Sequence, residues 1–308
     1  MQIYQHWQGL ADTAKGASVA MGNFDGVHLG HRAVIDLNRN VAPLGILTFE
    51  PHPREYFAPT SPPFRLMNAE ARASRLAKLG VEHLYQLPFG PALAGLTPEQ
   101  FARDILSQGL GVIHVVVGAD FCFGKGRAGR AADLQALGNT YGFKVTVADL
   151  VKSDGVEISS TAIRRALTEG YPRDAASMLG HWHRIEGEVI HGEKRGRELG
   201  YPTANMSVAG LHLPKFGVYA VFADVLTGPQ AGSYMGAASL GVRPMFGVNQ
   251  PNLETYLFDF KGDLYGQHLS IAFVDYLRPE MKFDGLPGLL SQMAADCTRA
   301  GEILVAIP

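Results

Sequence analysis

The chain has 308 residues and a formal net charge of −2, with 46% hydrophobic and 18% charged residues. This is the composition of a globular enzyme of about two domains. It excludes a global basic field for binding DNA or RNA, and no apolar run approaches the ~20 residues of a membrane span. The cysteines, Cys122 and Cys297, are far apart in the sequence, which argues against a disulfide framework. Together with an N-terminus that lacks the segments of a signal peptide, they indicate a cytoplasmic protein. The sequence does not indicate the oligomeric state.

The first half of the chain predicts strands that alternate with helices. Buried strands are expected at 17–21, 44–49, 83–87, 113–117 and 144–147, and helices at 32–38, 69–79, 98–107 and 130–141. Asn68 and Gly80 carry start and stop signals for a helix, and Thr97-Pro98-Glu99-Gln100 is a capping box. The stretch 51–63 holds five prolines and is expected to be a loop. This order predicts a doubly wound α/β domain, with a parallel sheet covered by helices on both faces.

The second half predicts a different architecture. Two short helices are expected at 163–169 and 173–179, followed by strands at 185–190, 218–225, 233–240, 253–260 and 268–273 and a helix at 288–304. Period-two alternation with glycine punctuation favours a compact antiparallel barrel of about six strands. The domain boundary is expected near Gly180, where the second short helix ends.

The stretch Met21-Gly22-Asn23-Phe24-Asp25-Gly26-Val27-His28-Leu29-Gly30-His31 lies between the first apolar strand and the first helix. Unpaired backbone N–H groups at a helix start attract anions. Residues i and i+3 share a helix face, so both imidazoles can face one phosphate. Three interpretations are open for His28-x-x-His31: ordinary core or surface histidines, a metal pair without an obvious third ligand, and a phosphate contact. The glycine-rich turn before the pair favours the third.

A second segment supports a phosphate site. Ile158-Ser159-Ser160-Thr161-Ala162-Ile163-Arg164 places three hydroxyl residues at a helix start and an arginine one turn later. Hydroxyls cap free N–H groups, and an arginine there can bind a phosphate with two hydrogen bonds. Taken alone this is an ordinary N-cap with a surface arginine, but two such helix starts in one domain favour the functional interpretation.

A competing dinucleotide-binding motif lies between the histidine motif and the ISST segment. Residues 124–129 fit G-x-G-x-x-G, and Asp149 follows 20 residues after Gly129, as in a dinucleotide fingerprint. The glycines begin seven positions after Val117 and not in a strand-to-helix turn, which argues against a dehydrogenase.

The second half holds its own candidate residues. Residues 187–205 combine four glycines with cationic side chains between strands, which suits a backbone cradle for phosphates. Thr203 and Asn205 offer oxygens that suit Mg²⁺ bound together with ATP phosphates. On the strand that follows, Glu254, Tyr256 and Phe258 are expected on one face. Glu254 is either a solvated residue or a base that accepts the proton of a hydroxyl during phosphoryl transfer.

Two motifs of the first half, GNFDGVHLGH at 22–31 and ISSTAIR at 158–164, resemble those of the HxGH nucleotidyltransferases. The resemblance is specifically to the adenylyltransferase half of bacterial bifunctional riboflavin kinase/FAD synthetases. Residues 48–53 (TFEPHP) and 116–124 (VVGADFCFG) are similar to that family's flavin-side segments. From about His183 to Leu304 the chain resembles the riboflavin kinase module, through GRELGYPTAN, FGVYAV, SLGVRPMFG, ETYLFDF and LRPEMKFDG. The resemblance implies ATP-dependent phosphorylation of riboflavin to FMN, then adenylyl transfer from a second ATP to FMN, which gives FAD and pyrophosphate.

The resemblance also implies roles for individual residues. The catalytic residues would be Glu254, His28, His31 and Arg164. ATP would be bound by Gly22, Asn23, Phe24, Gly30, Ser159, Ser160, Thr161, Gly196, Gly200, Thr203 and Asn205. The flavin would be bound by Pro51, His52, Pro53, Asp120, Phe121, Phe123 and Arg243. Magnesium would be held by Thr203 and Asn205.

The chain departs from the family's pattern at a few positions. Met245 stands where a threonine is expected, Cys122 stands where a polar or basic residue is commoner, and the 191–195 loop is unusually charged. None of these positions carries a residue assigned to chemistry. Two alternatives to the dual enzyme remain, a single-activity enzyme and a non-catalytic flavin or nucleotide sensor. Retention of the two histidines, Arg164 and Glu254 argues against both.

Overall fold

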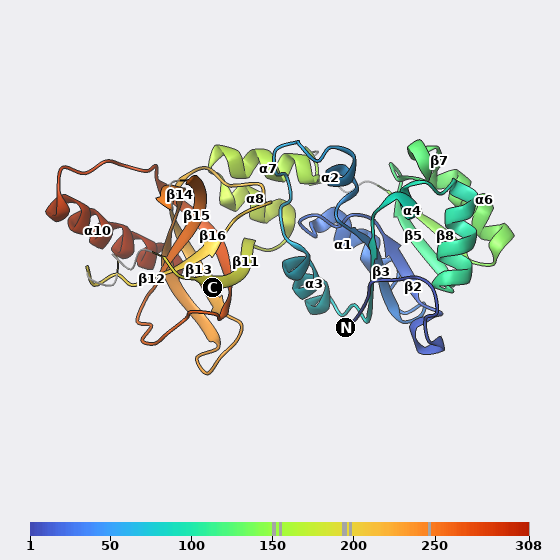
Figure 1. Cartoon of the computed structure of the whole chain (residues 1–308), viewed down its shortest axis with the longest axis horizontal. Helices are drawn as coiled ribbons and strands as arrows, with labels where there is room; N and C mark the ends of the chain where they lie inside the picture. The colour runs from blue at the N-terminus through green and yellow to red at the C-terminus, as the bar shows by residue number, and fades with distance from the viewer. Residues whose placement is uncertain (150–151, 154–155, 193–195, 197–198, 246–247, 308) are drawn as a thin grey trace. The chain divides into compact units, whose positions relative to one another are not determined.

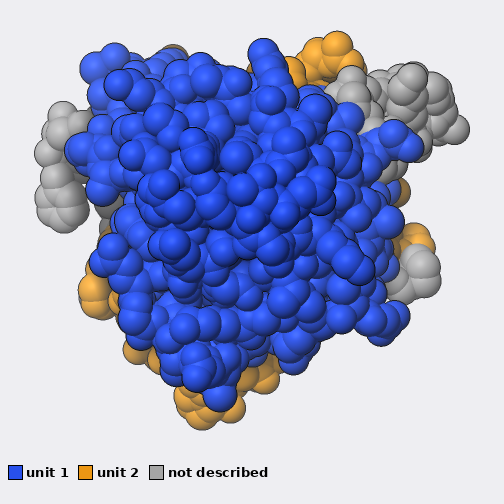
Figure 2. Space-filling view, turned by 90° about the vertical axis from the view of Figure 1, so that its right-hand side faces the viewer, with its two compact units in different colours: residues 1–62, 72–159 blue, residues 63–71, 160–308 orange. Residues whose placement is uncertain are grey.

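The computed structural model describes residues 1–149, 152–153, 156–192, 196, 199–245 and 248–307. Residues 1–62 and 72–159 form one compact unit, which we call unit 1, and residues 63–71 and 160–308 form a second, unit 2 (Figure 2). The order of helices and strands along the chain can be followed in Figure 1.

Unit 1 is built on a six-stranded parallel sheet. Its strands lie in the order β1 (Gln2–Tyr4), β4 (His83–Pro88), β3 (Leu44–Glu50), β2 (Ser18–Met21), β5 (His114–Gly118) and β8 (Lys144–Ala148). The five strands predicted from apolar runs are confirmed. β1 was not predicted because it is only three residues long and has no buried residue to mark it.

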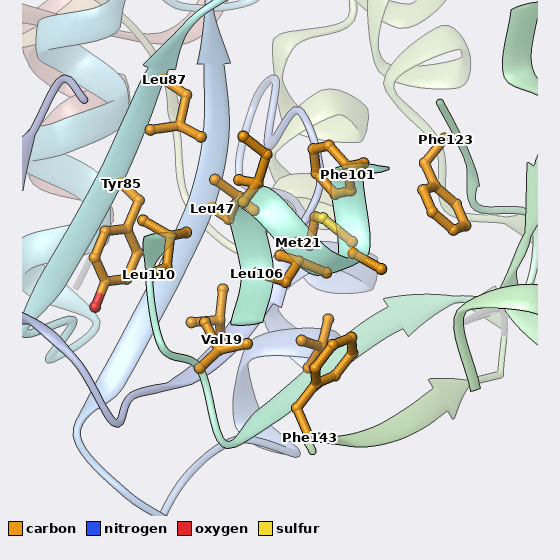
Figure 3. Close-up of a cluster of buried hydrophobic side chains, with 14 of the residues drawn as sticks. Val19, Met21, Leu47, Tyr85, Leu87, Phe101, Leu106, Leu110, Phe123 and Phe143 are labelled. Carbon is orange, nitrogen blue, oxygen red and sulfur yellow. The ribbon is translucent and has the colours of Figure 1, made fainter. Parts of the chain in front are cut away.

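Helices cover both faces of this sheet, as predicted. Alternate residues of β2, β3, β4 and β5 pack against the π-helix η2 (Phe101–Gly109) and α6 (Ala131–Tyr141). Figure 3 shows this cluster, in which Val19, Met21, Leu47, Tyr85, Leu87, Phe101, Leu106, Leu110, Phe123 and Phe143 are labelled. The other face is covered by α1 (Leu29–Asp36) and α3 (Ala69–Lys78).

Two local predictions in unit 1 need correction. The stretch 51–63 is not all loop, because α2 (Pro53–Phe57) forms within it. His52 caps α2 by accepting from the Arg54 N–H at 3.0 Å, while Glu55 accepts from the His52 N–H at 3.1 Å. The helix expected from Pro98 starts as α5 (Pro98–Gln100), with the predicted capping box at Thr97, but continues in the wider π geometry of η2. A short α4 (Pro91–Ala94) was not anticipated.

Unit 2 contains a closed antiparallel barrel of six strands, which confirms the predicted architecture. Its strands lie in the order β11 (His183–Ile190), β12 (Thr203–Ser207), β15 (Val248–Leu257), β14 (Gly232–Met245), β13 (Gly217–Val225) and β16 (His268–Arg278). β12 was predicted as loop. Ala204 and Met206 point into the barrel core, and the strand closes the barrel between β11 and β15. Glu254 and Tyr256 share the outer face as expected, whereas Phe258 lies beyond the end of β15.

Three helices of unit 2 pack against the barrel or one another. α10 (Leu286–Val305) covers the outer faces of β13, β14 and β16, with Ala300 and Leu304 fully buried. α7 (Ser160–Glu169) packs on α8 (Pro172–Leu179), which ends at Gly180 in the left-handed conformation. α7 and α8 therefore belong to the same compact unit as the barrel, and the boundary at residue 180 stays a prediction.

Candidate active sites

The first candidate site lies in unit 1, at the turn from β2 into α1. His28 is the N-cap of α1, and its Nδ1 accepts a hydrogen bond from the backbone N–H of His31 at 3.2 Å. This bond places the proton of a neutral His28 ring on Nε2. The two imidazole rings stack with centroids 3.6 Å apart and planes 16° apart. The i, i+3 spacing thus brings the two predicted histidines together as one pair.

The pair is electrostatically unusual. Burial, together with the charge that His28 can carry, holds the pKa of His31 well below its ordinary value. Among the described residues, Nδ1 of His31 has no hydrogen-bond partner although it is buried. A buried, unpartnered ring nitrogen beside a helix start is suited to contact an incoming anion. The described residues offer no cluster of three His, Cys, Asp or Glu side chains around a common metal position.

Gly30 has a steric reason to be glycine. A Cβ at this position would lie 3.1 Å from Cε1 and Nδ1 of His28, which is tighter than an ordinary contact. It would also lie 3.5 Å from the carbonyl oxygen of Ile158. Ile158, the first residue of the ISST segment, therefore lies beside the start of α1. The histidine motif and the ISST motif thus meet at Gly30.

The turn before His28 has a strained backbone. Phe24 and Val27 both adopt positive φ, at 52° and 44°, although neither is glycine and both side chains are buried. Such conformations persist only where the surroundings over-determine them, and they cluster at functional sites. Here the Asn23 carbonyl oxygen accepts from Thr48 Oγ1 at 3.2 Å and from Arg72 Nη1 at 3.4 Å.

The rest of the ISST segment begins α7, in unit 2. Ser159 closes unit 1, while Ser160 and Thr161 open α7 and Arg164 lies one turn later. Within unit 2, Arg164 Nε donates to the Phe64 carbonyl at 2.6 Å, and its guanidinium lies 5.4 Å from the centre of the Phe64 ring. The participation of Arg164 in adenylyl transfer stays a prediction.

The predicted flavin-side segments follow β3 and β5, the two strands that flank β2 in the sheet. Pro51, His52 and Pro53 come directly after β3 and lead into α2. An aromatic group lies beside them, because the Phe89 ring contacts the rings of Tyr56 and Phe57 edge-on at 5.5 and 5.7 Å. Phe57 is 66% exposed, which is unusual for so apolar a side chain.

The second segment follows β5. Asp120 is exposed, and the rings of Phe121 and Phe123 stack at 5.8 Å. Cys122 is one of the departures from the family pattern. Its Sγ accepts a hydrogen bond from Arg130 Nη1 at 2.8 Å.

The rival dinucleotide motif is excluded by its local structure. Residues 124–129 connect β6 (Cys122–Phe123) to β7 (Gly129–Arg130) in an antiparallel hairpin and do not join a strand to a helix. A Cβ at Gly124 would lie 2.7 Å from the Pro98 nitrogen, and one at Gly129 would lie 2.7 Å from the Phe123 ring. Packing therefore explains both of these glycines without a bound pyrophosphate.

The second candidate site lies in unit 2, on the outer face of β12 and β15. Asn205 and Glu254 are directly paired across these antiparallel strands. Asn252 joins them, because its amide donates to Asn205 Oδ1 at 3.2 Å and to Glu254 Oε1 at 3.5 Å. Thr203 lies on the same face, one strand period before Asn205. Three of the residues predicted from sequence are thus placed together.

A cavity of about 450 Å³ opens beside Thr203. Its walls are largely apolar and aromatic, with a few charged groups, and they include Val189, Pro202, Leu257, Phe260, Asp263 and Tyr265. An apolar slot with a few polar groups is the usual form of a small-molecule site.

The glycine-rich stretch before β12 is only partly described. The Gly196 carbonyl accepts from the N–H groups of Leu199 and Tyr201, and Gly200 has a φ of 82°. Gly192 approaches the face that carries Asn205 closely, since a Cβ there would lie 2.5 Å from Asn205 Nδ2. The side chains of Arg243 and Met245 lie outside the described residues.

Comparisons with known proteins agree with the two-part geometry. A family model for FAD synthetase matches residues 10–162, and one for riboflavin kinase matches residues 179–304. A bifunctional riboflavin kinase/FMN adenylyltransferase of Pseudomonas fluorescens is 39% identical over 306 residues, covering 97% of each chain. Its Escherichia coli K12 counterpart is 39% identical over 294 residues, covering 94% of this chain and 93% of its own. The chain belongs to this family.

A solved structure supports the fold over nearly the whole length of this chain. The crystal structure of a protein described as a macrolide-efflux protein from Streptococcus pneumoniae is 29% identical, with a TM-score of 0.80 and 96% coverage of both chains. Within the described part of the present chain, no helix has both the length and the apolarity needed to cross a membrane.

Sequence reasoning missed several residues that shape these sites. Thr48 and Gln86 are polar side chains on the sheet face under α3, Arg72 projects from α3 toward them, and Asn252 is a buried amide at the second site. A signal was present, because Thr48 and Gln86 interrupt two apolar strands at positions that pair with each other. Polar residues inside buried strands need partners, and Arg72 provides one for Gln86.

Proposed function

We propose that the chain makes FAD from riboflavin in two steps, at two separate centres. In unit 2, riboflavin is phosphorylated by ATP to give FMN and ADP. In unit 1, FMN attacks a second ATP to give FAD and pyrophosphate. The observation that carries the proposal is that one chain contains both the stacked histidine pair at the start of α1 and the Asn205–Asn252–Glu254 group on the barrel.

For the kinase step, Glu254 accepts the proton of the ribityl 5′-hydroxyl while the hydroxyl oxygen forms a bond to the γ-phosphorus. The bond from the γ-phosphorus to the bridging oxygen breaks, and ADP leaves. Asn252 donates to Glu254 Oε1 and so helps to fix the orientation of this carboxylate. ATP lies with its base in the cavity beside Thr203 and its phosphates toward the glycine-rich stretch, which includes Gly196 and Gly200.

Magnesium suits this second site. The Thr203 hydroxyl and Asn205 Oδ1 are oxygen donors on one strand face, and an amide oxygen has two lone pairs, of which Asn252 engages one. Mg²⁺ is commonly held by one or two protein oxygens together with substrate phosphates, so a site with few protein ligands is sufficient. The ion supplies charge neutralisation of the transferred phosphoryl group.

For the adenylyl step, a phosphate oxygen of FMN attacks the α-phosphorus, the α–β bridging bond breaks, and pyrophosphate leaves. No protein nucleophile is needed, so the protein aligns two anions and stabilises the developing charge. His28 and His31 contact the phosphates of ATP at the start of α1, with Gly22, Asn23, Phe24 and Gly30 shaping the turn. Participation of Ser159, Ser160, Thr161 and Arg164 in holding these phosphates stays a prediction from the family resemblance. FMN binds toward residues 51–53 and 120–123.

The test is to incubate the protein with riboflavin and ATP, with Mg²⁺ or with EDTA in excess, and to resolve the flavins by chromatography. Sequential appearance of FMN and then FAD, only with Mg²⁺, is expected. FMN without FAD would show a single-activity kinase, and no conversion would favour a flavin or nucleotide sensor.

A further inference from the structure

The structure assigns Arg72 as a positioning residue that aligns the ATP side with the flavin side of the adenylyl-transfer site. This inference rests on the proposed function of unit 1. Arg72 projects from α3, and its side chain is only 4% exposed. Few arginines are buried to this extent without several hydrogen-bond partners.

The guanidinium joins three different segments. Nη1 lies 3.4 Å from the Asn23 carbonyl oxygen, and Nη2 lies 2.9 Å from Glu50 Oε2 and 3.2 Å from Gln86 Oε1. Asn23 belongs to the turn before the histidine pair. Glu50 is the last residue of β3 and belongs to the predicted flavin-side segment, residues 48–53, directly before Pro51. One rigid, planar cation is therefore bonded to both predicted substrate loops.

The contact with Asn23 determines how the turn presents its backbone. A trans peptide is planar, and its C=O and N–H point in opposite directions. Because Arg72 and Thr48 hold the Asn23 carbonyl on the α3 side, the N–H of Phe24 is turned to the opposite side. Phe24 has a φ of 52°, a conformation that relaxes unless its neighbours are fixed. Arg72 thus helps to fix the direction in which the turn presents this backbone donor.

The contact with Glu50 fixes the second loop against the same group. Arginine and lysine differ here, since only the guanidinium fork can reach several acceptors in one plane. Adenylyl transfer requires the FMN phosphate to lie in line with the α-phosphorus, and a displacement of about 1 Å can lower the rate about 100-fold. Loss of Arg72 is therefore expected to change the turnover number as well as both Michaelis constants.

The test uses the full-length chain with four variants, Arg72→Met, Arg72→Lys, Glu50→Gln and Thr48→Val. For Arg72→Met we expect an adenylyl-transfer kcat about 100-fold below wild type. Arg72→Lys keeps the charge but should fall about 10-fold. Glu50→Gln should raise KM for FMN more than KM for ATP. Thr48 also lies in the flavin-side segment, but its hydroxyl is bonded to the Asn23 carbonyl, so Thr48→Val should raise KM for ATP more than KM for FMN. A purely structural defect would not produce this separation between substrates.

Each variant contains its own control, because riboflavin phosphorylation in unit 2 should stay at the wild-type rate. Arg103→Met is the matched arginine control, since Arg103 is paired with Asp104 at 2.6 Å on η2 of the same unit. It should leave both activities unchanged. His31→Ala tests the proposed site itself and should abolish FAD formation whatever the role of Arg72.

Two outcomes overturn the inference. One is an Arg72→Met enzyme with adenylyl-transfer kcat within about threefold of wild type. The other is an equal rise in both Michaelis constants for Glu50→Gln and Thr48→Val. If Arg72→Met fails to fold, Arg72→Lys decides, and a fully active lysine variant contradicts the inference. If His31→Ala keeps FAD formation, the proposed site has failed and Arg72 is not the cause.

Discussion

His183 should make the barrel of unit 2 sensitive to acid. The side chain is 2% exposed, packs against the Phe273 ring at 5.8 Å, and has a buried Nε2 with no hydrogen-bond partner among the described residues. Burial, reinforced by the nearby His181 and His212, lowers the pKa of His183 to about 3. The unfolded chain binds its proton near pH 6.5, so unfolding is favoured as pH falls below that value.

The size of this effect follows from the shift. Stability is fully present above pH 6.5 and is lost progressively down to the folded pKa of about 3. Between pH 7 and pH 5 this single group should lower the free energy of unfolding by about 2 kcal/mol, at about 1.4 kcal/mol per pH unit below 6.5. The non-titrating variant His183→Phe should not show that loss, whatever its stability at pH 7.

The assay is urea unfolding followed by tryptophan fluorescence. The chain has two tryptophans, and Trp7→Phe leaves Trp182, which packs against the α10 cluster of unit 2. Unfolding free energies at pH 7 and pH 5 are compared between this background, the same background with His183→Phe, and a control with the partly exposed His268 replaced by Gln. Equal pH dependence in the first two proteins would refute the reasoning.

Three further predictions concern single contacts. Gly30→Ala should displace the His28 ring and lower FAD formation about 100-fold, while riboflavin phosphorylation, measured in the same assay, stays unchanged. Thr255→Val should stabilise the barrel by about 1 kcal/mol in urea unfolding, because the buried Thr255 hydroxyl has no partner among the described residues; a destabilised variant would contradict this. Asp296→Asn should destabilise unit 2 by about 3 kcal/mol, because it breaks the buried pair with Arg278 at 2.7 Å; an unchanged melting temperature would exclude this role.

Much of the fold follows from hydrophobic periodicity. The central strands of unit 1 are buried on both faces, so their positions were clear from sequence. In the second half, the succession of short strands punctuated by glycine was sufficient to predict a barrel. Short elements were missed for a physical reason. β12 is marked by only two inward residues, Ala204 and Met206, and lies after a stretch of glycines and a proline that reads as a loop.

Candidate site residues could be predicted where a motif concentrates them in a few positions, as at His28 and His31 or at Thr203 and Asn205. Residues that act from a distance in sequence were not found. Arg72 is 49 residues from Asn23 and 22 from Glu50, and only the folding of β3 under α3 brings them together. The pairing of Asn205 with Glu254 likewise depends on the register of β12 and β15.

The central claim, two catalytic centres on two units, is tested most directly by two single variants assayed on both substrates. Glu254→Gln should make no FMN from riboflavin but should still convert supplied FMN to FAD. His31→Ala should make FMN at the wild-type rate and no FAD. If either substitution abolished both activities in a folded protein, or if neither reduced its own activity, the assignment of the two centres would be contradicted.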